Sequence, residues 1–139
     1  MNLYLTRHGA TLENEQKCYL GWTDVELSPQ GTWQAEQLAV YFQARPPFSL
    51  YCSDLKRATR TAEIIGSRHR LKPEASPLLR ELNFGKWEGL TWEQISSAYP
   101  EELKLWLKDP FQHPPPEGES LWEMKQRTDL FLNNLLQAN

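Results

Sequence analysis

Apolar residues follow strand-like spacing in three places along the chain. Residues 3–5 form a short apolar run bounded by polar positions, which predicts a buried strand. A second apolar run at residues 48–52 predicts another strand, and residues 74–82 a further extended stretch. Each predicted strand is followed by a segment of different periodicity, so the chain alternates between element types.

Between the predicted strands, apolar residues recur at helical spacing. Ser28 and Pro29 predict the start of a helix that ends before the prolines at 46–47. The Ser–Asp pair at residues 53–54 predicts a cap for a second helix over about residues 55–68. The order strand, helix, strand, helix, strand is typical of an α/β fold with a parallel sheet.

The remainder of the chain is predicted to be helical and loop-rich. Thr91 and Gln94 resemble a capping box for a helix toward residue 99, and a short helix follows over residues 100–108. Residues 109–118 contain four of the ten prolines and predict a loop. A last helix is expected over about residues 119–136. Its predicted buried face consists of Leu121, Met124, Thr128, Phe131, Leu132 and Leu135.

Two loops are expected near the predicted strand ends. Residues 9–27 are polar with little periodicity, and residues 84–89 are punctuated by glycine. A long polar loop of this kind tends to be functional.

Composition excludes several classes of protein. The 139 residues suit one domain spanning the whole chain, 1–139. A net charge of −3 argues against a nucleic-acid partner, which usually requires a basic surplus. Cys18 and Cys52 form no disulfide framework or zinc-ligand pattern. With no signal-peptide pattern and no membrane-spanning run, we expect a cytoplasmic location and no membrane partner.

A histidine follows the first predicted strand within the pentapeptide Arg7-His8-Gly9-Ala10-Thr11. Ligands of α/β sheets bind at the carboxyl ends of strands, so His8 is well placed to act. The positive charge of Arg7 disfavours the imidazolium, which keeps the ring nucleophilic. Gly9 lets the backbone approach a ligand closely. The alternative is a strand-end histidine that only bonds to backbone.

Arg57 lies at the start of the second predicted helix, again just after a strand. Helix N-termini attract anions, and a guanidinium can donate two hydrogen bonds to a phosphate. A solvated basic face is the alternative, and it suits Lys56 and Arg60 better than Arg57.

Three further residues are candidates for the same site. Glu81 precedes the glycine-punctuated loop and could protonate a leaving oxygen, or could pair with Arg80 at the surface. Asn14 and Gly21 lie in the polar loop after His8 and could donate to phosphate, although ordinary loop residues are the alternative.

Together the candidates favour phosphoryl transfer. This chemistry depends on positioning and positive charge, which a histidine nucleophile, two arginines and a carboxylic acid supply. We therefore expect no metal and no cofactor, and a small phosphate ester as the ligand.

The chain resembles the histidine phosphatase superfamily, also called the phosphoglycerate-mutase-like family. The resemblance extends in order along nearly the whole chain. Its motifs are Arg7-His8-Gly9-Ala10-Thr11 with Asn14, Gly21-Trp22-Thr23-Asp24, Leu27-Ser28-Pro29-Gln30-Gly31, Ser53-Asp54-Leu55-Lys56-Arg57-Ala58 with Thr61-Ala62, Glu81-Leu82-Asn83-Phe84-Gly85-Lys86-Trp87-Glu88-Gly89, and Pro116-Glu117-Gly118-Glu119-Ser120.

The resemblance implies a three-layer α/β/α sandwich with a mostly parallel central sheet. It also implies roles. His8 would be phosphorylated and then attacked by water, and Glu81 would be the proton donor. Arg7 and Arg57 would bind the phosphate, assisted by Asn14 and Gly21.

One departure from the family pattern concerns a second catalytic histidine. The family carries it in a His-Gly motif after the last helix, whereas His69 and His113 here are not followed by glycine. We therefore expect the chain to lack that C-terminal segment. Its isolated sheet should expose apolar surface, which a homodimer could cover.

The short connection after Glu81 is similar to that of the smaller phosphatases. α-Ribazole phosphatases of cobalamin synthesis rank first as the expected activity. Phosphoserine phosphatases, broad-specificity phosphatases and phosphoglycerate mutases are alternatives within the family. A binding relative without turnover is a further alternative from a different class.

Overall fold

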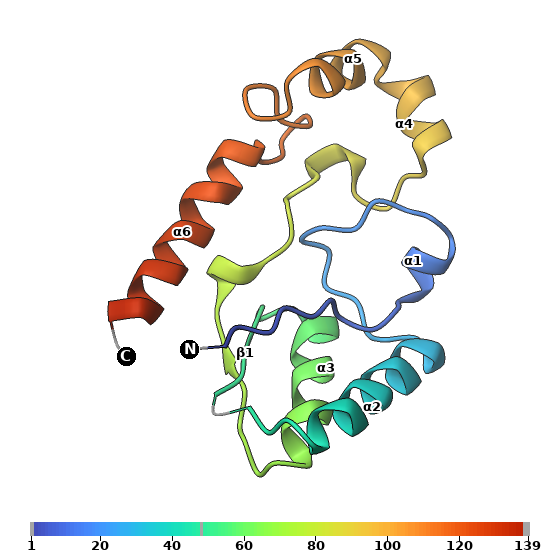
Figure 1. Cartoon of the computed structure of the whole chain (residues 1–139). Coiled ribbons are helices and arrows are strands. Elements are labelled where there is room, and N and C mark those ends of the chain that lie inside the picture. The colour runs from blue at the N-terminus through green and yellow to red at the C-terminus, as the bar shows by residue number, and fades with distance from the viewer. Residues whose placement is uncertain (1, 48, 138–139) are drawn as a thin grey trace. The chain divides into compact units, whose positions relative to one another are not determined.

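The computed structural model describes residues 2–47 and 49–137, which divide into two compact units (Figure 1). The first unit comprises residues 1–12 and 24–76, and the second comprises residues 13–23 and 77–139. The chain therefore passes between the units three times, and each unit is built from segments distant in sequence.

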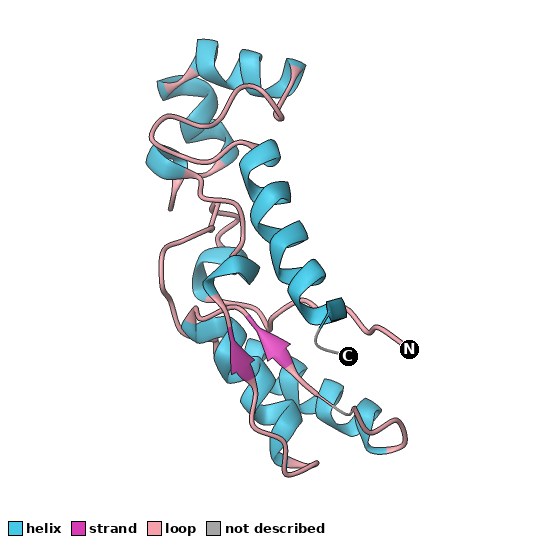
Figure 2. Ribbon diagram, turned by 90° about the vertical axis from the view of Figure 1, so that its left-hand side faces the viewer, coloured by secondary structure: helices cyan, strands magenta, loops and turns pink. Residues whose placement is uncertain are grey.

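A two-stranded parallel sheet and two helices form the first unit (Figure 2). Strand β1 (Tyr51–Cys52) pairs with β2 (Glu74–Ala75), with Tyr51 opposite Glu74. Helix α2 (Pro29–Gln43) packs against α3 (Lys56–Ser67). The parallel pairing confirms the sequence expectation for these two strands, although both are shorter than predicted. Phe48, at the start of the second predicted strand, lies outside the described residues.

Apolar residues of α2 and α3 form the core of this unit. Ala39, Phe42 and Ile65 are almost fully buried and pack together. Burying a large apolar side chain contributes about 1.5–3 kcal/mol, so this cluster is a main source of stability. It fixes the position of α3, whose first turn carries Arg57.

The prediction of a strand at residues 3–5 is wrong. The structure gives these residues no β-bridge, and Leu3, Tyr4 and Leu5 are 58%, 49% and 86% exposed. A strand requires a neighbour that completes its hydrogen bonds, and no described segment supplies one here. The Tyr4 ring instead packs edge-on against Phe42, with 5.6 Å between ring centroids.

The start of α2 follows the prediction, whereas the start of α3 follows it only in part. The Ser28 hydroxyl accepts from the Gly31 N–H and caps α2 as expected. The residue at the cap position of α3 is Leu55, which makes no side-chain capping bond, and the Ser53 hydroxyl accepts from the Leu55 N–H at 3.3 Å, just before the helix. The Asp24 carboxylate accepts from the Lys56 N–H at 2.8 Å. Sequence reasoning missed this cap because it comes from a distant segment.

The second unit is mostly helical and lacks a sheet among its described residues. The predicted capping box is confirmed: Thr91 and Gln94 cap α4 reciprocally. The extended stretch predicted over residues 74–82 ends at β2, and a 3-10 helix follows it. The elements of this part of the chain are η1 (Pro77–Leu79), η2 (Gly85–Trp87), α4 (Trp92–Ala98), α5 (Pro100–Lys108) and α6 (Leu121–Gln137). A short helix, α1 (Leu12–Glu15), lies within the predicted polar loop.

A tryptophan forms the centre of the second core. Trp87 is 1% exposed and packs with Ile95 and Leu103. Its ring meets Trp106 edge-on, at 5.9 Å between centroids. This cluster connects η2 to α4 and α5, and so stabilises the turn that follows Glu81.

The predicted face of α6 is less buried than expected. No described residue of this helix is fully buried; Leu132 is 39% exposed, and the other five predicted residues are partly buried. The apolar spacing is present, but α6 packs chiefly on the short η1 segment, which is too small to cover the helix. None of the helices in residues 2–47 and 49–137 is long and apolar enough to cross a membrane.

Candidate active site

His8 lies in the first unit, at the end of the N-terminal segment, and is half-buried. The next residue is anchored to α3, because the Gly9 N–H donates to the Thr61 hydroxyl at 3.1 Å. That hydroxyl in turn donates to the Arg57 carbonyl at 2.8 Å. Thr61 therefore ties the histidine-bearing loop to the helix turn that carries Arg57.

The hydrogen bonds of His8 define the tautomer of its ring. Nδ1 lies 2.7 Å from the Gly9 carbonyl oxygen, which can only accept, so Nδ1 carries the proton. Arg57 Nε donates to His8 Nε2 at 3.2 Å, and a guanidinium can only donate. Nε2 therefore carries the lone pair of the ring, and that lone pair accepts from Arg57. A neutral imidazole with its lone pair on Nε2 can act as a nucleophile once this hydrogen bond is given up.

Arg57 is unusually placed for an arginine because its side chain is 1% exposed. It lies in the first turn of α3, where helix N–H groups and the helix dipole favour anions. A buried cation beside a neutral histidine creates a local positive potential in a chain of net charge −3. The interpretation of Arg57 as part of a solvated basic face is therefore wrong. Lys56 and Arg60 are the exposed residues of this turn.

Two glycines allow the His8 loop to lie against the start of α2. A Cβ at Gly9 would come within 2.1 Å of the Gly31 carbonyl oxygen, and a Cβ at Gly31 within 1.9 Å of the Ala10 oxygen. The Ala10 N–H donates to the Gln34 side chain at 2.8 Å, and its carbonyl accepts from Ser28. The loop is therefore held on both sides by helices of its own unit.

Glu81 lies in the second unit, between η1 and η2, and is exposed. Its carboxylate accepts from the N–H of Leu82 at 2.8 Å. Its backbone carbonyl accepts from the Trp22 indole and from Arg127, each at 2.9 Å. The backbone around this carboxylate is thus held firmly while its side chain faces solvent. The Arg80 guanidinium, the alternative partner considered for Glu81, lies over the Trp22 ring.

Gly21 and Asn14 also lie in the second unit. Gly21 is buried, and its N–H donates to Glu88 Oε2 at 3.0 Å. A Cβ at this position would lie 1.8 Å from the Leu82 carbonyl oxygen, so only glycine fits. Asn14 is part of α1 and is half-buried.

Glu88 organises the loop that contains Gly21. Its carboxylate accepts from the N–H groups of Gly21, Trp22, Thr23 and Phe84 and from the Thr23 hydroxyl, at 2.8–3.3 Å. Partial burial opposes ionisation, but these hydrogen bonds outweigh it and hold the pKa of Glu88 below its ordinary value.

The predicted residues are divided between the two units. Within the first unit it joins His8 to Arg57, while the Arg7 side chain is exposed. Asn14, Gly21 and Glu81 belong to the second unit. Sequence reasoning missed the supporting role of Thr61. Its spacing of four residues from Arg57 is the signal that could have placed both on one face of a helix.

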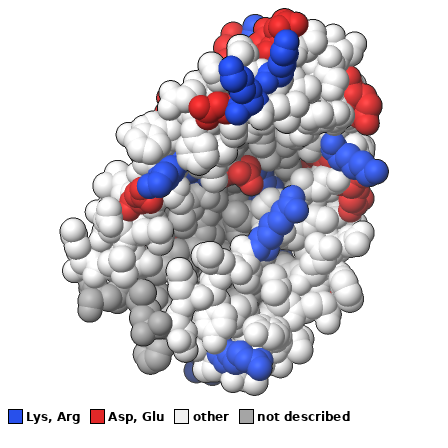
Figure 3. All heavy atoms as spheres, turned by 45° about the horizontal axis from the view of Figure 1, so that its top comes forward, with Lys and Arg blue, Asp and Glu red and all other residues white. Residues whose placement is uncertain are grey.

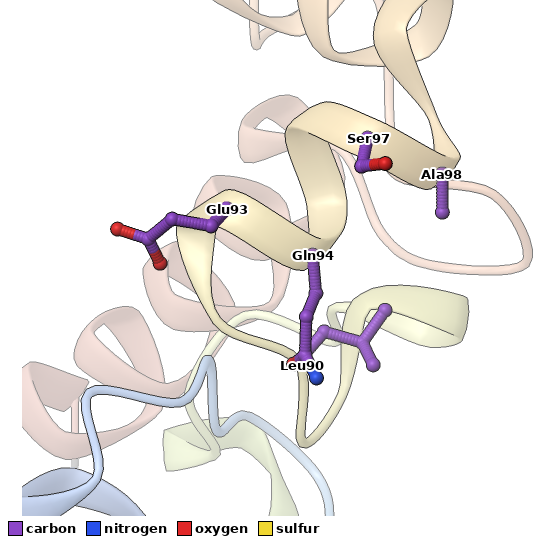
Figure 4. A pocket seen from close by; sticks show the side chains of 5 residues that line it. All are labelled: Leu90, Glu93, Gln94, Ser97 and Ala98. Atoms are coloured by element: carbon purple, nitrogen blue, oxygen red, sulfur yellow. The ribbon is translucent and has the colours of Figure 1, made fainter.

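Other surfaces of the molecule offer weaker candidates. Acidic and basic side chains are interspersed over the face in Figure 3, without an extended basic patch. An open hollow on α4 is lined by Leu90, Glu93, Gln94, Ser97 and Ala98. Gln94 extends toward Leu90, whereas Glu93 points away (Figure 4). The hollow contains none of the predicted catalytic residues. Within the described part of the chain, no cluster of three or more potential metal ligands is present.

Comparison with known proteins identifies the family of this chain. The sequence profile of the histidine phosphatase superfamily (branch 1) matches residues 3–139. The chain is 32% identical to the adenosylcobalamin/alpha-ribazole phosphatase of Escherichia coli, over 97% of this chain and 66% of the relative. It is 30% identical to phosphoserine phosphatase 1 of Hydrogenobacter thermophilus, over 97% of this chain and 64% of the relative.

Solved structures give the same result. A mycobacterial glucosyl-3-phosphoglycerate phosphatase in complex with VO3 superposes with a TM-score of 0.87 at 33% identity, covering 95% of this chain and 63% of that one. This similarity confirms the expected α/β fold. The chain spans about two thirds of the length of the relatives that it matches. It belongs to the histidine phosphatase superfamily.

Proposed function

We propose that this protein hydrolyses phosphate monoesters through a phosphohistidine at His8. The observation that carries the proposal is the pairing of His8 Nε2 with the buried Arg57, together with the Nδ1 proton held by Gly9. This geometry supplies a lone pair for phosphorus and a cation for the phosphate oxygens. The relatives named as phosphatases support the same reaction class.

In the first step, the Arg57 Nε–H transfers its hydrogen bond from His8 Nε2 to a phosphate oxygen, the freed Nε2 lone pair attacks phosphorus, and the bond from phosphorus to the ester oxygen breaks. The negative charge on the phosphoryl oxygens is stabilised by Arg57 and by Arg7. The departing oxygen takes a proton from Glu81, and Asn14 and Gly21 assist in phosphate binding. Because Nδ1 donates to a carbonyl, that carbonyl also stabilises the positive charge that the phosphorylated ring acquires.

In the second step, water attacks the phosphohistidine, and the nitrogen–phosphorus bond breaks. The Glu81 carboxylate left by the first step accepts the proton from water, which restores the acid for the next cycle. The products are inorganic phosphate and the free alcohol.

α-Ribazole 5′-phosphate is the first substrate we propose, and phosphoserine is the second. A relative named adenosylcobalamin/alpha-ribazole phosphatase is 32% identical to this chain, and two relatives named as phosphoserine phosphatases, one of them putative, are 33% and 30% identical, each over nearly the whole chain. These identities do not rank the two esters, because specificity depends on residues around the site rather than on the fold. Competing the two esters against each other and comparing kcat/KM would distinguish them. A kcat/KM for phosphoserine well above that for α-ribazole phosphate would reverse the order.

The decisive experiment measures hydrolysis of para-nitrophenyl phosphate by the chain and by its His8→Ala variant, both with EDTA present. We expect turnover in EDTA, because the protein's own arginines neutralise the phosphate, and we expect none from His8→Ala. Acid-labile, base-stable phosphate should label the wild-type chain only. Turnover that persists in folded His8→Ala would refute the proposed nucleophile. Phosphate binding without turnover by the wild-type chain would favour a binding relative.

A further inference from the structure

Arg127 and Glu119 form an ion pair next to the Glu81 backbone, and every N–H group of the Arg127 guanidinium donates a hydrogen bond. Arg127 on α6 donates from Nε and Nη2 to the two carboxylate oxygens of Glu119, at 2.6 and 2.9 Å. Both side chains are largely buried, at 13% and 12% exposure. Such bidentate pairs are the strongest hydrogen-bonded ion pairs in proteins and have a fixed geometry.

The rest of the Arg127 guanidinium binds backbone. Nη1 donates to the carbonyls of Leu78 and Arg80, at 2.9 and 2.6 Å, and Nη2 donates to that of Glu81 at 2.9 Å. All five N–H groups of a guanidinium are thereby used. The Glu119 carboxylate also accepts from the Asn83 N–H at 3.2 Å. The pair therefore holds the backbone on both sides of Glu81, while the Glu81 side chain remains exposed.

Stabilisation of the fold alone does not explain this arrangement well. Largely buried ion pairs are costly to desolvate, and apolar residues of similar volume often stabilise a protein equally well. Apolar residues cannot form hydrogen bonds with the backbone carbonyls of residues 78, 80 and 81 or with the N–H of residue 83. The polar network specifies where the backbone of residues 78–83 lies.

We propose that Arg127 and Glu119 are positioning residues for the proton donor. The inference rests on the role of Glu81 under the proposed function. In this account the pair fixes the backbone that carries the Glu81 carboxyl, without touching substrate. Lysine cannot replace Arg127, because an ammonium has three donors and no planar fork.

The test compares phosphoserine with para-nitrophenyl phosphate, because their leaving groups differ in how much they depend on protonation. The departing alkoxide of phosphoserine requires protonation, whereas para-nitrophenolate leaves readily without it. Arg127→Lys should lower kcat/KM for phosphoserine by about 10-fold or more, up to the ~10²–10⁴ that a positioned general acid supplies. It should change kcat/KM for para-nitrophenyl phosphate little, because kcat/KM reports only the steps through formation of the phosphohistidine and not the later attack of water, in which Glu81 also takes part. A purely structural defect would lower both rates equally.

Two further variants complete the design. Asp129→Asn removes an exposed ion pair with Lys125 on the same helix and should leave both rates unchanged. Glu81→Gln should show the same selective loss, and adding Arg127→Lys to it should cost little more, since coupled residues are not additive. Glu119→Gln provides a second approach if Arg127→Lys fails to fold.

The outcomes separate the two proposals. A selective loss in Glu81→Gln but an equal loss of both rates, or no loss, in Arg127→Lys and Glu119→Gln would overturn the positioning role alone. An equal loss of both rates, or no loss, in Glu81→Gln would overturn the proton-donor role and this inference with it. Absence of turnover in the wild-type chain would overturn the proposed function, and the inference that depends on it.

Discussion

At the scale of the residue, the state of the His8 ring follows from its neighbours. A carbonyl on one nitrogen and a guanidinium on the other leave one neutral tautomer, with the lone pair on Nε2. Sequence could identify His8 and Arg57 as candidates because both follow predicted strands. It could not predict their direct hydrogen bond, which depends on how Gly9 and Thr61 connect the loop to α3.

Replacing Arg57 tests whether its guanidinium binds phosphate. We expect Arg57→Ala to weaken inhibition by phosphate or vanadate by about 1.5–3 kcal/mol, the scale of a hydrogen bond to a charged group. That corresponds to a rise of roughly 10- to 150-fold in the inhibition constant, measured by competition against para-nitrophenyl phosphate.

The control for this substitution is Arg60→Ala. Arg60 lies on the same helix and pairs with Glu63 at the exposed surface, so its loss should change inhibition little. Equal weakening by both variants would indicate a general effect of helix charge rather than a phosphate ligand. Thermal unfolding of Arg57→Ala must be followed in parallel, because the side chain is buried.

At the scale of the element, the helices were predicted far better than the strands. The spacing and caps of α2 and α4 are local properties, so the sequence around Ser28 and Thr91 was sufficient. The strand predicted at residues 3–5 is absent, and the face of α6 is only partly buried, because an apolar pattern does not reveal whether a partner is present. The cap of α3 by Asp24 was missed for a similar reason.

Glu88 connects two segments of the second unit and makes their stability depend on pH. Its folded pKa is lowered, so its stabilisation is present above the ordinary glutamate pKa of about 4.3 and is lost as the pH falls through the folded pKa. We expect Glu88→Gln to reduce the free energy of unfolding at pH 7 by about 1–3 kcal/mol, because buried N–H groups lose an acceptor.

The difference between this variant and the wild type should shrink as the pH is lowered below about 4 in urea denaturation series. Glu117→Gln is the matched control, since Glu117 pairs with Lys86 at an exposed site and should contribute little at any pH. A difference for Glu88→Gln that persists undiminished at pH 3 would show that its ionisation is not the stabilising factor.

At the scale of the whole molecule, each unit is discontinuous in sequence. Residues 13–23 belong with residues 77–139, although more than fifty residues of the first unit separate them. Cutting the chain at residue 76 would therefore divide the second unit rather than release it intact.

We expect the fragments 1–76 and 77–139 to fold poorly alone and to recover structure on mixing. Alone, the second fragment keeps Glu88 but lacks Gly21, Trp22 and Thr23, which donate to it. Circular dichroism and backbone NMR spectra of the separate and mixed fragments measure this. A fully ordered spectrum from residues 77–139 alone would contradict the dependence on the distant segment.

The same discontinuity imposes an order of events during synthesis. The ribosome adds about 5–20 residues per second, so residues 21–23 are made several seconds before Glu88 exists to accept from them. During that interval α2 and α3 can pack together through their own apolar contacts. The backbone N–H groups of residues 21–23 remain hydrated, because Glu88, which accepts from them in the folded protein, has not yet been made. Translation speed over residues 24–88 thus sets how long this loop is open to proteases and chaperones.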